Sequence, residues 1–377
     1  MDVSLQQLVL HLSLINGVGP ALVKKLYECL GSERFLRLYN FNVQDLITFG
    51  SISSHSAQLI VDGLKDRALL DHELALIEKH HINWFTSFDE HYPALLKEIH
   101  LPPLVLYCKG TLPSQPSLAV VGSRQANLYG ERVIYQLVPQ LIAQGFAIVS
   151  GGALGADAMA HRATVQYGGK GVVVLGSGLL RPYPIAHKKL FDEIVLNGGC
   201  VLSPFGMEVS AAPGNFPARN RVISGLSLGC VVIQAAQASG SKITALFSLE
   251  QGRDVFAVPG PIDDPLSVGC HELIAQGAKL VHSVNDILHE FPLHCSPIAQ
   301  VVPEKKEIKS TNEKQLMSNE NNQPLAVQII SHCQEPKSVD DLVELLGLDL
   351  NTVQAAVFDL QLCGKIEQNY SGLWQQI

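Results

Sequence analysis

LAVVGSRQANLYGERVIYQLVPQLIAQGFAIVSGGALGADAMAH, residues Leu118–His161, is the stretch that decides the fold of this chain. Two short apolar runs, Leu118–Val121 and Phe146–Val149, each lead into a glycine-bearing turn that opens a segment with helical periodicity. Two successive strand-turn-helix units predict a parallel sheet with crossover helices. The turns of such a sheet lie at the carboxyl ends of its strands, where backbone N–H groups and helix N-termini can hold an anion. The stretch therefore predicts an α/β core with a phosphate-binding crevice.

The two turns contain Gly122-Ser123-Arg124 and Gly151-Gly152. The hydroxyl of Ser123 and the guanidinium of Arg124 suit an oxyanion. A single glycine turn can simply reverse the chain, but two in register favour a ligand site. Neither turn has the spacing of the dinucleotide fingerprint, and no Walker A sequence occurs. The sequence thus disfavours a nicotinamide-dependent dehydrogenase and gives no support to nucleoside triphosphate hydrolysis.

Further short apolar runs rich in β-branched residues complete the expected sheet, with helical segments between them. They are Gly171–Leu175, Cys200–Leu202, Cys230–Ala235 and Val255–Val258. About six strands would form an open, doubly wound, Rossmann-like and mostly parallel sheet. The preceding segment, residues 82–110, alternates short strand, Tyr-Pro break, helix and strand, and we expect it at the edge of this sheet.

Polar segments later in the chain are expected at the same sheet edge. Phe216 lies between prolines, in what we expect to be an exposed loop, and it precedes Arg219 and Arg221. An aromatic face beside phosphate donors is the pairing used for single-stranded nucleic acid, whereas a core phenylalanine that fixes the loop is the alternative. Lys242 follows Ser-Gly-Ser at the start of a predicted helix, which is typical of a further anion cradle.

The charge of the chain limits where a polyanion could bind. The 377 residues carry a net charge of −8, which excludes a wholesale basic coat. Residues 115–290 contain twelve Lys and Arg and twelve Asp and Glu, so this segment is neutral. We nevertheless expect a positive crevice, because five cations fall in or beside loops of one sheet edge: Arg124, Arg181, Arg219, Arg221 and Lys242.

The sequence gives no sign of a membrane segment, a disulfide framework, a metal site or a cofactor. No apolar run reaches the roughly 18 residues that a membrane span needs, and the N-terminus lacks a basic n-region, so we expect a cytoplasmic protein. The eight cysteines include no CxxC pair and are expected to be reduced. A group of possible metal ligands lacks helical spacing and predicts no metal: His282, His289, His294 and Cys295.

Composition and periodicity predict four parts of the chain. Residues 1–75 read as short helices, residues 76–290 as the α/β core and residues 291–323 as a polar, aperiodic flexible linker. Residues 324–377 read as three helices and a strand pair, typical of a winged helix. That last part has two basic and seven acidic residues, so we expect a protein-interaction or regulatory module and not a reader of duplex DNA.

The segment Ile15–Leu26 in the helical N-terminal part resembles a helix-hairpin-helix. In that motif, hairpin N–H groups contact a nucleic-acid phosphate, with Lys24 and Lys25 nearby. An ordinary helical turn with a solvated lysine pair is an equally good interpretation.

Six segments, in order between residues 82 and 290, resemble the DNA-processing protein A (DprA/Smf) family. They are YPALLKEIHLPPLVLYCKG, VVGSR, VSGGALGADAMAH, FPARNRVISGLS, GSKITALFSLEQGRDVFAVPG and GCHELIAQGAKLV. The resemblance implies a non-enzymatic Rossmann-like core that binds single-stranded DNA, forms a homodimer and helps to load the RecA recombinase during natural transformation. It also implies that the N-terminal helices are similar to a sterile-alpha-motif domain.

Carried over to this sequence, the resemblance implies DNA contacts at Gly122, Ser123, Arg124, Gly151, Gly152, Phe216, Arg219, Asn220 and Arg221, to which the anion cradle adds Lys242. Three positions depart from the family pattern. Ala156 stands where isoleucine is common, His271 where asparagine is common, and Pro204 where an acidic residue usually follows the serine. The departures leave the phosphate turns intact.

An enzyme on the same scaffold is the alternative. Asp157 and His161 are spaced as an acid-base pair could be, but we expect Asp157 to fix the turn and His161 to pack nearby. Phosphoribohydrolases of the LOG type hold a nucleoside monophosphate with similar turns, and Glu250 would be the candidate acid. Their expected Pro-Gly-Gly-x-Gly-Thr sequence is missing, which favours a binding protein.

Overall fold

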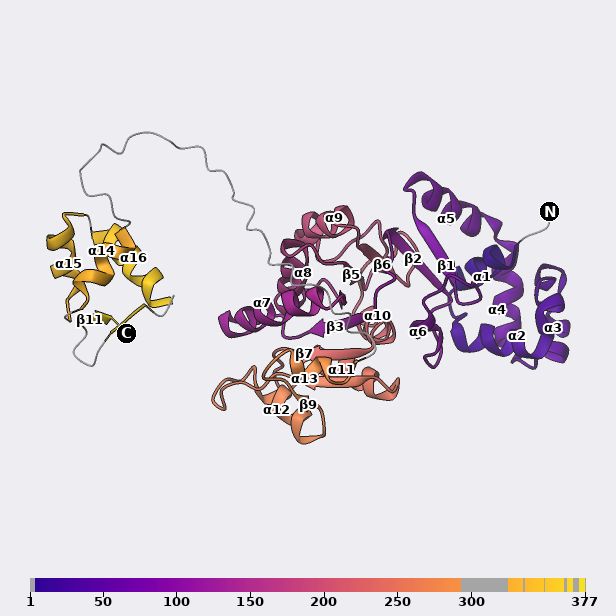
Figure 1. Cartoon of the computed structure of the whole chain (residues 1–377). Coiled ribbons are helices and arrows are strands. Elements are labelled where there is room, and N and C mark those ends of the chain that lie inside the picture. The colour runs from indigo at the N-terminus through magenta and orange to yellow at the C-terminus, as the bar shows by residue number, and fades with distance from the viewer. Residues whose placement is uncertain are drawn as a thin grey trace. The chain divides into compact units, whose positions relative to one another are not determined.

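Figure 1 shows a computed structural model of the chain, which describes residues 4–292, 325–334, 336–348, 350–362, 365–368 and 373–376. The described residues form two compact units, one on each side of residues 293–324. The linker expected at 291–323 therefore lies almost entirely outside the described residues.

The first unit is built on a nine-stranded sheet with the order β1-β2-β6-β5-β4-β3-β7-β8-β9. Its strands are β1 (Asn83–Thr86), β2 (Val105–Gly110), β3 (Ser117–Val121), β4 (Ala147–Ser150), β5 (Gly171–Val174), β6 (Cys200–Ser203), β7 (Gly229–Val232), β8 (Asp254–Ala257) and β9 (Lys279–Leu280). The six predicted strands are all present, and 82–110 forms the sheet edge as expected. The two residues of β9 were not predicted, since so short a run carries no periodicity.

The direction of the strands separates the edge from the core. From β6 to β9 all neighbouring strands are parallel, whereas β2 runs antiparallel to both β1 and β6. Strands β4, β5 and β6 follow β3 on one side, and the chain then crosses to place β7, β8 and β9 on the other side. The order of the strands thus reverses between β3 and β7, which is where open α/β sheets bind ligands.

Helices cover both faces of the sheet, as the doubly wound prediction requires (Figure 1). In β3, Leu118 and Val120 face one layer, whereas Ala119 and Val121 face the other. The first layer holds α7 (Leu128–Ala143), α8 (Ala156–Gln166), α9 (Lys188–Leu196) and α13 (Asn285–Leu288). The second layer holds α6 (Ala94–Lys97), α10 (Asn215–Gly225), α11 (Gly240–Glu250) and α12 (Val268–Ala275).

The N-terminal part is helical, as predicted, and it packs on the antiparallel edge of the sheet. It comprises α1 (Leu5–Leu14), α2 (Pro20–Phe35), the short η1 (Leu38–Asn40), α3 (Val43–Gly50), α4 (Ser54–Lys65) and α5 (Arg67–Lys79). Buried Val105 and Tyr107 of β2 belong to the same core as these helices, and Glu73 of α5 accepts a 2.8 Å hydrogen bond from the N–H of Met207. Lys24 of the hairpin segment is exposed and lies 4.0 Å from Glu28.

The second unit contains the three helices and the strand pair that the sequence predicts. They are α14 (Leu325–His332), α15 (Val339–Leu346), α16 (Leu350–Leu362), β10 (Ile366–Gln368) and β11 (Trp374–Gln376). Ile329, Leu342, Val353 and Trp374 are buried together in its core. Its assignment as a winged helix stays a prediction, and the turn at Ser371-Gly372 lies outside the described residues. Across both units, none of the described helices is long and apolar enough to cross a membrane.

Candidate nucleic-acid interface

A cleft of ≈ 560 Å³ opens at the carboxyl ends of β3 and β7, where the order of the strands reverses. The turn after β3, the start of α8, the first turns of α10 and the N-terminus of α11 contribute its walls. Six of the ten predicted DNA contacts line it: Gly122, Ser123, Arg124, Phe216, Arg219 and Asn220. The fold thus brings together residues that are about 100 positions apart in the sequence, because parallel strands end at one edge of the sheet.

The turn after β3 is held rigidly by its own polar groups. A Cβ on Gly122 would lie 2.7 Å from that of Ala156, so this position requires glycine. The N–H of Ser123 donates to Gln234 O at 2.7 Å, and its Oγ accepts from the N–H of Gln125 at 3.0 Å. The buried Ser123 therefore shapes the turn, and its expected contact with DNA stays a prediction. The turn exposes the side chains of Arg124 and Gln125 at the cleft, and Arg124 is the charged one.

The prolines that flank Phe216 predicted a loop, but the residue lies in the first turn of α10. The guanidinium carbon of Arg124 lies 5.3 Å from the centre of its ring, and that of Arg219 lies 6.0 Å away. The ring also packs on the backbone at Gly176, where a Cβ would be 2.9 Å from Cδ1 of Phe216. The half-buried ring thus lines the cleft and supports Arg124, and its stacking on a base stays a prediction.

The floor of the cleft contains a buried pair of opposite charges. Oδ2 of Asp157 accepts a 3.2 Å hydrogen bond from the N–H of Ala153 and lies 4.0 Å from Nη1 of Arg219. Arg219 is only 5% exposed, and its Nε and Nη1 have no hydrogen-bond partner among the described residues. Burial raises the pKa of Asp157 and lowers the pKa of Arg219, since each charge has lost most of its water.

This pair changes the interpretation of the second glycine turn. A Cβ on Gly151 would overlap Nη1 of Arg219. A Cβ on Gly152 would lie 2.7 Å from Cε1 of Phe191, and Gly152 does not line the cleft. The anion beside the turn is the protein's own Asp157, which confirms that this residue fixes the turn. A phosphate at Gly151-Gly152 would lie close to this carboxylate, and the DNA contact expected there stays a prediction.

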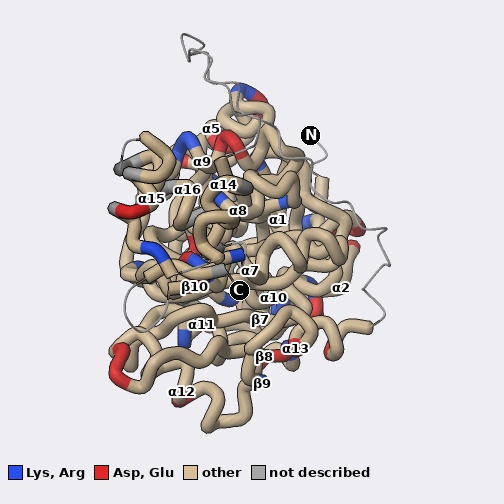
Figure 2. Tube along the Cα trace, turned by 60° about the vertical axis from the view of Figure 1, so that its left-hand side comes forward, with Lys and Arg blue, Asp and Glu red and all other residues tan. Residues whose placement is uncertain are grey.

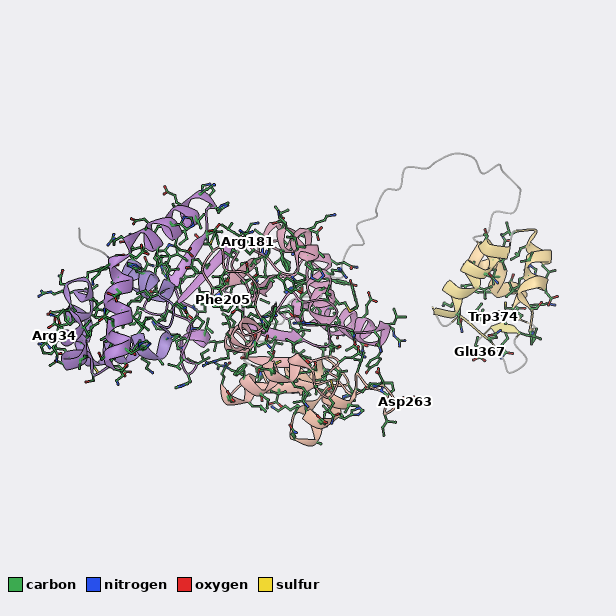
Figure 3. All side chains as sticks on the ribbon, turned by 180° about the vertical axis from the view of Figure 1, so that it is seen from behind. Arg34, Arg181, Phe205, Asp263, Glu367 and Trp374 are labelled. Carbon is green, nitrogen blue, oxygen red and sulfur yellow. The ribbon has the colours of Figure 1, made fainter. Side chains whose placement is uncertain are left out.

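Three of the five cations expected in the crevice are engaged elsewhere. Nη2 of Arg221 donates to His100 O, and Nζ of Lys242 pairs with Glu272 and donates to Gln237 O at 3.0 Å. Arg181 lies on the side of the core next to the N-terminal helices (Figure 3), where it helps His72 to lower the pKa of Glu208. Basic and acidic residues are interspersed over the fold in Figure 2. Among the described residues that line the cleft, the exposed positive charge is therefore that of Arg124.

A polar network that the sequence analysis missed positions the turn after β3. Nε2 of Gln234 donates to Oδ1 of Asn127 at 3.0 Å, and Oε1 of Gln234 accepts from the N–H of Asn127 at 3.1 Å. Asn127 in turn caps α7, because its Oδ1 accepts from the N–H of Tyr129. The feature of the sequence that could have indicated this network is the amide side chain of Gln234, near the end of the apolar run CVVIQA.

The residues considered for catalysis do not form a site. His161 is completely buried, and burial lowers its pKa to about 3, so it is a neutral packed side chain near pH 7. Glu250 is the last of the eleven residues of α11, which places it about 15 Å along the helix from the N-terminus that lines the cleft. No cluster of three or more metal-ligating side chains occurs among the described residues.

Residues 83–292, which include the whole cleft, match the family model of DNA recombination-mediator protein A. The chain belongs to this family. It is 40% identical over 262 residues to the DNA processing protein DprA of Streptococcus pneumoniae, covering 67% of this chain and 90% of that protein. It is 37% identical over 304 residues to the protein Smf of Escherichia coli, covering 80% and 79%.

Solved structures of relatives support the same assignment. The X-ray structure of DprA from Streptococcus pneumoniae has a TM-score of 0.67 at 35% identity and covers 77% of this chain and 99% of that one. DNA processing protein A from Helicobacter pylori, described for its single-stranded DNA binding mode, has a TM-score of 0.51 at 26% identity and covers 58% and 99%. The resemblance to the DprA/Smf family is thus confirmed.

Proposed function

We propose that this chain binds single-stranded DNA in the cleft between β3 and β7 and acts in DNA recombination and natural transformation. The observation that carries the proposal is the exposed guanidinium of Arg124, which stacks on Phe216 at a switch point of the sheet. A guanidinium binds a backbone phosphate, and an adjacent aromatic ring offers an apolar contact to a base. The Helicobacter pylori relative with a single-stranded DNA binding mode agrees with this class of ligand.

The geometry indicates how the strand would lie. The N-termini of α10 and α11, helices of eleven residues each, end at the cleft, and their positive dipole ends favour phosphate there. The carboxylate of Asp157 in the floor repels a phosphate, so the backbone would follow the Arg124 rim and not the Gly151 turn. Contacts of this kind select a single strand and carry weak sequence preference.

Family membership is also the support for the proposed partners. As a recombination mediator, the chain would act without catalysis as a cytoplasmic homodimer, formed through the Rossmann-like core, that loads RecA on the bound strand. The acidic second unit would contact protein and not duplex DNA, because phosphate binding needs the opposite charge.

A titration of fluorescein-labelled oligothymidine with the full chain at 50 mM and 200 mM salt tests the DNA proposal. We expect saturable binding that weakens with salt, and weaker binding to a duplex of equal length. Arg124→Ala should lower the affinity and reduce the slope of log K against log salt by about 0.7, since one phosphate contact of a single strand is lost.

Arg162→Ala is the matched control, because this arginine is exposed on α8 and does not line the cleft. Its affinity and salt slope should equal those of the unmodified chain. Absence of oligothymidine binding at 50 mM salt would contradict the proposed function, and an unchanged slope in Arg124→Ala would remove that residue from the site.

A further inference from the structure

We propose that Tyr183 is a second base-stacking position, outside the cleft and next to Phe216. The proposal rests on the proposed function, since it extends the path of the same DNA strand. Tyr183 lies in the loop after β5, its side chain is 51% exposed, and its ring centre is 6.0 Å from that of Phe216 at an angle of 57°. An exposed aromatic ring this close to the phosphate-binding arginine has the chemistry that single strands use.

Phe216 offers a base only part of its ring. One guanidinium lies 5.3 Å from its ring centre, and the ring packs against the chain at Gly176. A base beside Arg124 therefore finds part of the Phe216 ring already covered by the protein. The neighbouring ring of Tyr183 is the aromatic surface that remains accessible beside it.

A small depression of ≈ 40 Å³ joins this ring to the cleft. Tyr183 lines it together with Leu154, which is 53% exposed, and it shares Arg124, Ala153, Phe216 and Arg219 with the cleft. The depression is much smaller than the cleft of ≈ 560 Å³, so a base would not be enclosed in it. A base would instead lie flat on the rim, between water and the apolar side chains, and its edge would form no hydrogen bonds with the protein. The result is stacking without selection among bases.

The loop that carries Tyr183 is fixed before DNA arrives. The N–H of Gly178 donates to Val209 O at 2.7 Å, and the N–H of Leu180 donates to Met207 O at 2.9 Å. After the tyrosine, Nδ1 of His187 donates to Gly152 O at 2.9 Å. A loop whose backbone is already ordered loses little backbone conformational entropy when a base stacks on the tyrosine, so more of the contact energy appears as affinity.

The test compares Tyr183→Ala with Tyr183→Phe in the full chain, using oligothymidine and an abasic oligonucleotide of equal length. Tyr183→Ala should bind oligothymidine about fivefold or more weakly with an unchanged salt slope, because an apolar contact and no ion pair is lost. Tyr183→Phe should retain the affinity, and the abasic strand should not distinguish the three proteins. Tyr167→Ala is the control, since this ring is 39% exposed at the end of α8 and lines neither the cleft nor the depression.

The outcomes separate this proposal from the proposed function. If the unmodified chain binds oligothymidine and Tyr183→Ala binds equally well, the stacking position is refuted while the cleft remains the binding site. A loss that persists on the abasic strand, or one that Tyr183→Phe shares, also refutes stacking. If the unmodified chain does not bind, the proposed function fails first. Equal thermal midpoints of the variants would show that folding is not the cause, as expected for an exposed side chain.

Discussion

Replacement of Arg219 by methionine should destabilise the whole first unit. Methionine keeps most of the volume of the arginine stem, so the change mainly removes a charge. Asp157 is buried at the floor of the cleft, and Arg219 is the cation beside it, with 4.0 Å between Oδ2 and Nη1. Breaking a buried pair by removal of one partner typically costs about 3–5 kcal/mol, because the remaining charge is left without compensation. We therefore expect the free energy of unfolding of Arg219→Met to fall by about this amount at pH 7.

The loss should depend on pH with a definite sign. Burial raises the pKa of Asp157, and Arg219 opposes that rise, so removal of the arginine raises the pKa further. A carboxyl group with a higher pKa in the folded state binds more protons there, and stability then falls as pH rises from the unfolded value near 3.8 through the folded value. The difference between Arg219→Met and the unmodified chain should accordingly be small near pH 4, grow as pH rises, and level off above the folded pKa.

Urea unfolding followed by circular dichroism at pH 4.5, 5.5 and 7 measures this difference. The double variant Arg219→Met/Asp157→Asn should recover part of the stability at pH 7, since no buried charge remains, and Arg162→Ala should match the unmodified chain. Equal stability of Arg219→Met and the unmodified chain at pH 7, or a difference that does not change with pH, would refute the assignment of a buried ion pair.

Two further predictions concern a cation outside the cleft and a buried histidine. Lys242→Ala should leave the oligothymidine affinity and its salt slope unchanged, because Nζ pairs with Glu272; a slope smaller by about 0.7 would return Lys242 to the DNA site. His161→Leu should remove a loss of stability that the unmodified chain shows as pH falls. Burial lowers the pKa of His161 from 6.5 to about 3, so below pH 6.5 the unfolded state takes up a proton that the folded state does not. That loss in the free energy of unfolding amounts to about 1.4 kcal/mol per pH unit. Urea unfolding at pH 6 and pH 5 measures it, and an equal change in the free energy of unfolding of both proteins would contradict the prediction.

Local features of the amino-acid sequence were enough to predict the architecture and the place of the site. Short apolar runs bounded by turn residues, such as Leu118–Val121, favour buried strands, and glycine turns followed by helical periodicity favour crossovers. These local rules predict a parallel sheet, which places the carboxyl ends of its strands at one edge. Gly122, Arg124 and Phe216 could therefore be assigned to one crevice from the sequence alone. The motifs that resembled the DprA/Smf family lie in the same elements.

Only the tertiary structure decided which side chains serve that crevice. Periodicity constrains the path of the backbone, but a long side chain ends at whichever partner the fold brings near it. Lys242 finds Glu272 thirty residues away, and Arg221 finds the carbonyl of His100 across 121 residues. In the same way Asp157 lies beside the Gly151 turn and Arg219 is buried beside it, so an internal ion pair adjoins a segment that was expected to bind phosphate. Such pairings depend on distances between remote elements, which no local pattern in the sequence encodes.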